Sequence, residues 1–206
     1  MKKLLLGLLL SFFVFENSNA EVEWNASITN EYVWRGMSQG DGAAISGGID
    51  IYNDFGFWAG AWVTNVDFDD DTTYELDVYI GYTIGALSIG YVYYAFPNNT
   101  GEGYDSSEIN VSAEIGSFTI AANILADADW EMEFAEEIYY SIDTAFGMTD
   151  NVDLSLHLGF YDYDIDDDET DYGMSIDFHS GFSFGVIDST RDNSNPFVVI
   201  SYSING

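Results

Sequence analysis

Residues 152–161 read VDLSLHLGFY and alternate between an apolar side chain and a polar or small one. Such a period of two is typical of a β-strand with one apolar and one polar face. The same alternation occurs at 108–115, 138–143 and 172–179, and no helical periodicity is sustained in residues 21–206. The pattern therefore indicates an all-β protein.

Extended along the chain, this alternation predicts twelve strands, at residues 22–36, 43–52, 57–66, 74–83, 87–96, 108–115, 118–125, 138–147, 152–161, 172–179, 182–187 and 197–205. Every odd-numbered connection between them is longer than both of its neighbours. An antiparallel meander with long loops at one end and tight turns at the other is the layout of a membrane barrel. We therefore predict an antiparallel up-and-down transmembrane β-barrel of about 12 strands.

The charge is strongly one-sided and unevenly distributed. The 206 residues include 36 Asp plus Glu and only 4 Lys plus Arg, for a net charge of −32. Of the acidic residues, 22 lie in the six longer predicted loops and two, Asp54 and Asp150, lie in the short turns. So few cations exclude nucleic-acid binding. Without cysteine there are no disulfides, thiolate metal sites or cysteine nucleophile.

A soluble β-sandwich would also show a period of two. Such sheets usually protect their edges with lysine, which residues 21–206 lack. Aromatic residues gather near the predicted strand ends, among them Trp24, Tyr32, Trp34, Tyr94 and Tyr202, as in the interfacial girdles of membrane barrels. These features favour the barrel.

The first 20 residues have the features of a signal peptide. Lys2 and Lys3 precede an apolar stretch at 4–15, and small residues follow at Ser18 and Ala20. The alternative is a buried N-terminal helix. We predict a signal peptide at 1–20, a barrel domain at 21–206, and export to the outer membrane of a Gram-negative bacterium.

Residues 27–50 carry a Y-x-W-R-G-x-S segment made of Tyr32, Trp34, Arg35, Gly36 and Ser38. With further likeness up to Pro97, this region resembles the TorF family of porins, also catalogued as a conserved bacterial family of unknown function. The resemblance implies an outer-membrane barrel with pore activity and supplies no catalytic residues. Barrels of this kind commonly end in an aromatic residue, whereas this sequence ends SING.

The polar strand faces supply candidate pore-lining residues, which are Glu31, Arg35, Glu75, Asp77, Glu108, Glu114, Asp143, Asp153, His157, Asp177 and His179. Strand parity places Arg35 on the polar face of 22–36. It could orient anionic groups of a solute, but we favour a counter-ion role toward wall carboxylates such as Glu75 or Asp77, because unpaired carboxylates repel one another. The acidic row predicts a cation-preferring lumen; a hydrated wall without selectivity is the alternative.

No enzymatic site is expected. Ser155, His157 and Asp153 alternate on one strand face, and residues two apart stand about 7 Å apart along a strand, so a hydrogen-bonded dyad would need a partner from a neighbouring strand. Asp67, Asp69 and Asp71 match the first EF-hand spacings, but Thr72 replaces the required glycine. We expect diffuse binding of divalent cations at the acidic loops, without a dedicated metal site or any cofactor.

The sequence thus predicts a small porin-like channel for passive diffusion of small hydrophilic solutes, with outer-membrane lipid and these solutes as partners. Twelve strands enclose more space than the eight that side chains can fill, and less than the sixteen of open porins, so a narrow, partly occluded lumen is expected. The alternative is a structural or adhesive barrel with an occluded lumen and acidic surface loops.

Overall fold

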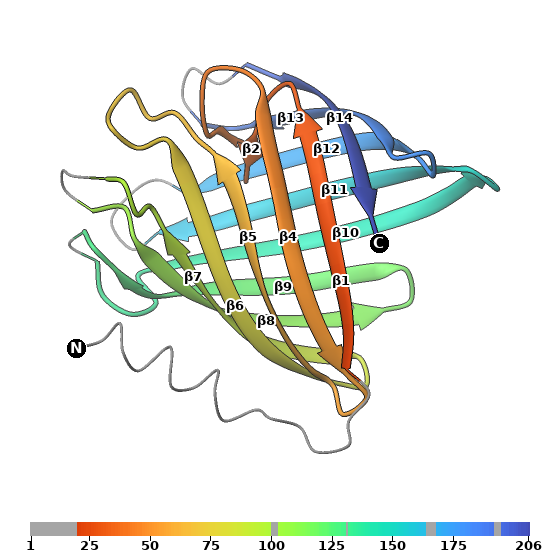
Figure 1. Ribbon diagram of the computed structural model, residues 1–206, viewed down its shortest axis with the longest axis horizontal. Helices are drawn as coiled ribbons and strands as arrows, with labels where there is room; N and C mark the ends of the chain where they lie inside the picture. The colour runs from red at the N-terminus through yellow and green to blue at the C-terminus, as the bar shows by residue number, and fades with distance from the viewer. Residues whose placement is uncertain (1–19, 100–102, 131, 164–167, 192–194) are drawn as a thin grey trace.

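The computed structural model describes residues 20–99, 103–130, 132–163, 168–191 and 195–206 (Figure 1). The predicted signal peptide lies outside these residues except for Ala20. Twelve antiparallel strands form a closed barrel, which confirms the predicted fold class. They are β1 Ala20–Thr29, β4 Ala44–Asn53, β5 Phe57–Asn65, β6 Tyr74–Ile84, β7 Leu87–Ala95, β8 Ser106–Ile115, β9 Phe118–Ala128, β10 Glu137–Thr149, β11 Val152–Tyr163, β12 Glu169–Phe178, β13 Phe182–Ser189 and β14 Phe197–Asn205.

The wall closes where the first strand meets the last. β1 pairs with β4 along its whole length and with β14 from Asn25↔Asn205 to Thr29↔Ser201. Figure 1 shows the red β1 beside the blue β14 at this seam. Closure gives every wall strand a hydrogen-bonded neighbour on each side, as the hydrocarbon of a bilayer requires.

The connections alternate in length as predicted. The turns at 54–56, 85–86, 116–117, 150–151 and 179–181 are short, and Gly85 and Gly116 give two of them the positive φ angles, +60° and +66°, of tight hairpins. The longer connections, such as 66–73 between β5 and β6, gather at the opposite end of the barrel. The barrel therefore has a loop end and a turn end.

The outer surface is apolar. Large apolar side chains stand exposed on all twelve wall strands; Leu158 in the middle of β11 is 50% exposed, beside Ile142 of β10 and Tyr172 of β12. The polar residues of the alternation face inward. No helix within the described ranges is long and apolar enough to cross a membrane.

The first predicted strand, 22–36, was too long. The wall strand ends at Thr29, and Asn30 fixes the exit of the chain because its backbone N–H donates to the carbonyl of Ile200 (3.1 Å). Residues 33–38 form a separate hairpin of β2 (Val33–Trp34) and β3 (Met37–Ser38). Arg35 and Gly36 between them have φ angles of +49° and +75°, the geometry of a type I′ turn, which an extended strand cannot accommodate.

We predict that Leu158→Arg destabilises the barrel in lipid, lowering its free energy of unfolding by about 2–4 kcal/mol, because a cation at the middle of the outer face must enter hydrocarbon. Urea titration of the barrel in lipid vesicles measures this loss. Ser155→Arg is the control, since the same cation then faces the lumen and should cost much less. Equal losses in the two variants would contradict the assignment of faces.

Candidate functional site in the barrel lumen

The β2–β3 hairpin crosses the lumen. At its stem the Tyr32 ring packs edge-on against Trp62 of β5, with 5.7 Å between centroids. At its tip Gly36 touches the opposite wall, where a Cβ added to this glycine would lie 2.7 Å from the Cβ of Asp171 on β12 and 2.8 Å from that of Ser189 on β13. Only glycine fits at this contact, so the hairpin is seated against the far wall.

Arg35 at the hairpin tip is the centre of a buried cluster. Its Nη1 and Nη2 donate to Oε1 and Oε2 of Glu108 on β8, both at 2.7 Å, and Nη1 also donates to the Tyr161 hydroxyl at 3.0 Å. The guanidinium carbon lies 4.2 Å from the ring centroids of Trp34 and Tyr139. The side chains of Arg35 and Glu108 are only 9% and 6% exposed. A bidentate ion pair with stacked rings is a strong, directional contact.

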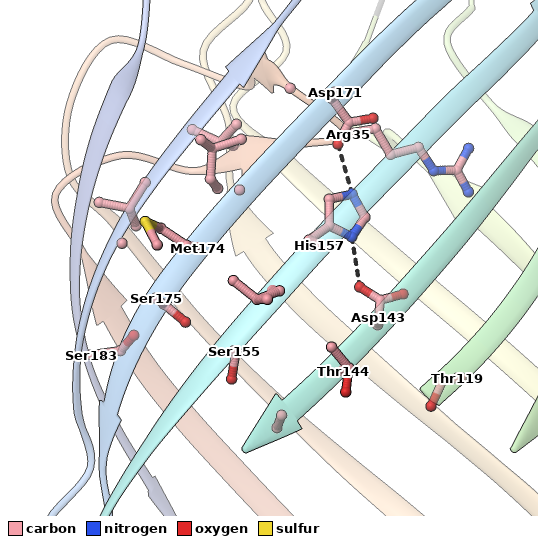
Figure 2. A pocket seen from close by; sticks show the side chains of 18 of the residues that line it. Arg35, Thr119, Asp143, Thr144, Ser155, His157, Asp171, Met174, Ser175 and Ser183 are labelled. Carbon is pink, nitrogen blue, oxygen red and sulfur yellow. Dashed lines mark hydrogen bonds and ion pairs between the residues drawn. The ribbon is translucent and has the colours of Figure 1, made fainter. Parts of the chain in front are cut away.

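His157 of β11 lies next to this cluster, on its turn-end side, in a network of carboxylates (Figure 2). Its Nδ1 is 2.6 Å from Oδ1 of Asp143, and its Nε2 is 2.7 Å from Oδ2 of Asp171. The Tyr139 hydroxyl donates to the other oxygen of Asp171 at 2.9 Å. Because Asp171 also supports the hairpin tip, this network connects the hairpin to β10, β11 and β12.

Asp177 is a further lumen carboxylate, closer to the turn end, and hydroxyl groups surround it. Asp177 accepts hydrogen bonds from the hydroxyls of Ser155 (2.6 Å), Ser175 (2.8 Å) and Ser183 (2.5 Å). Hydrogen bonds to the ionised form stabilise a carboxylate. Negative charge is thus held on the lumen wall.

Glu75 and Asp77 on β6 form a third acidic group, buried behind the hairpin. They are 5% and 9% exposed. Among the described residues, Oε2 of Glu75 and Oδ1 of Asp77 have no hydrogen-bond partner. The wall carboxylate that pairs with Arg35 is Glu108 of β8, two strands along the barrel from Glu75 and Asp77 of β6, which were the predicted examples of such partners.

The hairpin separates two cavities. One, of about 720 Å³, lies on the turn-end side and is lined by Val33 and Arg35 of the hairpin and by wall residues that include His157, Asp143 and Ser155. The other, of about 280 Å³, lies on the loop-end side and is lined by Trp34 and Met37 together with aromatic wall and loop residues. Alternate hairpin residues thus face different compartments.

The remaining predicted residues are dispersed. Glu31 lies in the connection after β1, where it accepts a hydrogen bond from the Ser38 hydroxyl. Glu114 lies at the turn end of β8, exposed. His179 lies in the β12–β13 turn, with Nε2 3.0 Å from Oδ2 of Asp153. None of these touches the Arg35 cluster directly in the contacts described above.

Ser155 and His157 of β11 bind different partners. The Ser155 hydroxyl donates to Asp177, while His157 contacts Asp143 and Asp171, so Ser155 and His157 do not share the geometry of a dyad. No group of three or more His, Asp or Glu side chains in the described part of the chain is arranged to hold a metal ion. Diffuse cation binding at the loops stays a prediction.

Sequence reasoning missed several members of the cluster. Tyr139 and Tyr161 share the parity of Asp143 and His157 and could have been placed in the lumen by that signal. Asp171 was assigned to a loop because the predicted strand began one residue later. Tyr94, assigned to the interfacial girdle, turns inward and donates to Glu108 at 3.0 Å.

Comparisons with known proteins agree with this fold. The profile of a family described as "Bacterial protein of unknown function (Gcw_chp)" matches residues 15–199. No curated protein matches the sequence significantly. Several solved structures are similar. Among them, a chain from "Unveiling the Mechanism Behind the in-meso Crystallization of Membrane Proteins" has a TM-score of 0.52 at 9% identity and covers 89% of this chain and 83% of its own. The KdgM porin has a TM-score of 0.51 at 9% identity, covering 90% and 99%. At such identity the likeness shows the fold alone.

We predict that Arg35→Met destabilises the barrel by about 3–5 kcal/mol, because it leaves the Glu108 charge buried without a partner. The double variant Arg35→Met/Glu108→Gln should lose less than the sum of the two single variants, since neither charge is then left alone. Urea titration in vesicles gives the double-mutant cycle. Additive losses would show that the pair does not couple the hairpin to the wall.

Proposed function

The chain belongs to the Gcw_chp family of bacterial proteins of unknown function, and we propose that it is a small porin-like channel of the outer membrane. In this proposal small hydrophilic solutes cross it by passive diffusion, cations are preferred, and no reaction is catalysed. The observation that carries the proposal is a closed barrel with an apolar exterior and, inside it, a cavity of about 720 Å³ whose lining includes Arg35, Asp143 and His157. An apolar outer face with a hydrophilic lumen is the arrangement that lets solutes cross a bilayer.

Cation preference is supported by the balance of charge inside the barrel. Arg35 is neutralised by Glu108, and Arg191 pairs with Glu169. The carboxylates of Asp143 and Asp177 on the turn-end side contact only histidine or hydroxyl groups in the interactions described above. A low-dielectric wall concentrates their field in the lumen, which attracts cations and repels anions.

The hairpin is the constriction in this proposal. It spans the lumen between the two cavities, so solutes must pass beside it or displace it. The same observation favours the second candidate, a structural or adhesive barrel whose lumen is closed and whose acidic loops make the contacts. Two 2.7 Å hydrogen bonds from Arg35 fix the hairpin to Glu108 in both candidates, so a measurement of conductance distinguishes the narrow pore from the plug.

The finer assignments belong to the same proposal. A signal peptide at 1–20 would bring the chain to the outer membrane, with lipid around the barrel and divalent cations loosely bound at the acidic loops. The narrower TorF-family assignment is supported by Tyr32, Trp34, Arg35 and Gly36, which build the hairpin and its anchor. We propose that this motif is the family's constriction.

We predict discrete conductance steps and a cation-selective reversal potential when the refolded mature protein is recorded in a planar bilayer under a KCl gradient. Asp153→Asn/Asp177→Asn should reduce the cation preference, because two lumen carboxylates lose their charge. An anion-selective reversal potential would refute the charge argument, and an absence of steps at high salt would favour the structural barrel.

We further predict that Arg35→Met increases the unitary conductance, because a hairpin without its anchor moves out of the lumen more readily. Arg191→Met is the matched control: it removes the same charge from an ion pair with Glu169, outside the constriction. The same bilayer recordings measure both variants. An unchanged conductance in Arg35→Met would mean that the hairpin does not limit the current.

A further inference from the structure

The cavity on the loop-end side of the hairpin has an unusual lining. Its volume is about 280 Å³, and more than half of its lining residues are aromatic, contributed by the hairpin, the wall and the loops. The part of the lining next to the Arg35 cluster consists of Trp34, Tyr94 and Tyr161. The part in or beside the loops includes Phe96, Tyr104 and Trp130. So many rings around a small cavity are suited to an apolar or cationic ligand.

The rings hold one another in place. Phe68, Phe96 and Tyr104 form a triangle with centroids 5.3–6.0 Å apart, and Trp34 meets Tyr94 at 6.0 Å. Arg35 already uses one of these rings, since its guanidinium lies 4.2 Å from the Trp34 centroid. Its charge is neutralised by Glu108, so it does not oppose a second cation in the cavity.

The described part of the lining includes a buried polar atom without a hydrogen-bond partner. Glu75 is 5% exposed and lines the cavity, and its Oε2 has no hydrogen-bond partner among the described residues. The Tyr32 hydroxyl donates to the Glu75 carboxylate, and Asp77 lies beside it. A buried carboxylate oxygen without a donor is costly, and a ligand that donates an N–H to it removes that cost.

We propose that this cavity binds a small organic ammonium ion with an apolar or aromatic body. Oε2 of Glu75, which is fully buried in this structure, turns toward the cavity and accepts a hydrogen bond from the ammonium group, and the body packs against the rings of Trp34, Tyr104 and Trp130. A volume of about 280 Å³ is near the lower limit of small-molecule pockets, so the ligand is compact. A neutral sugar would leave the carboxylate charge uncompensated, and a bare metal ion would not use the rings.

Binding at this cavity does not require that the barrel conducts. Its consequence for transport, that such ammonium ions enter the channel in preference to other solutes, rests on the proposed function. A direct binding measurement therefore separates the two. Binding without conductance would leave this site in place and refute the channel.

The test is calorimetric titration of the refolded mature protein in detergent with phenethylammonium chloride, with 2-phenylethanol as its neutral counterpart. We expect saturable binding of the ammonium ion at one site, with the alcohol at least about tenfold weaker. Glu75→Gln should weaken ammonium binding by a similar factor and leave alcohol binding unchanged. Quenching of tryptophan fluorescence gives a second readout, because Trp34 and Trp130 line the cavity.

Two further variants test whether a loss of binding comes from disruption of the fold or from a general change in the negative potential of the lumen. Trp130→Ala alters a ring that is 41% exposed at the loop end and should weaken both ligands. Asp153→Asn removes a lumen charge at the turn end and should bind phenethylammonium as the wild type does. The proposal is overturned if wild type shows no saturable binding, if Glu75→Gln binds as tightly, or if Asp153→Asn loses as much as Glu75→Gln. Saturation by glucose or calcium alone would also overturn it.

Discussion

The guanidinium of Arg35 donates two short hydrogen bonds to Glu108, and this contact decides where the first loop goes. A left-handed backbone conformation costs a non-glycine residue roughly 1–2 kcal/mol, and desolvation of both charges costs more. The ion pair, the Tyr161 hydroxyl and the two stacked rings offset those costs. This contact is the salt bridge that fixes the hairpin to β8.

The hairpin gives the two halves of the lumen different chemistry. On the turn-end side, serine hydroxyls and the His157 network surround carboxylates, so the environment suits hydrated ions. On the loop-end side, aromatic rings surround Glu75, and the environment suits a cation with an apolar body. The net charge of −32 by itself only excludes classes of partner. Inside the barrel, the carboxylates that contribute to it lie in two different environments, one on each side of the hairpin.

Much of the fold could be predicted from residues such as Leu154, Leu156 and Leu158, because an outer face in lipid must be apolar and the inner face polar. The same alternation continues through Glu31, Val33 and Arg35, so periodicity alone did not reveal that the strand stops at Thr29. The Arg-Gly pair was the available signal for a turn. The choice of Glu108 as partner could not be read from the sequence, because it depends on which strand lies across the closed ring.

The position of the hairpin has a consequence for the order of folding. It belongs to the connection between β1 and β4, and β1 also forms the closing seam with β14. Once that seam is made, the hairpin would have to enter a closed ring. Inserting it earlier avoids this, and contacts between residues so far apart in sequence form slowly. The salt bridge of Arg35 with Glu108 is therefore expected to form before β1 and β14 close the ring.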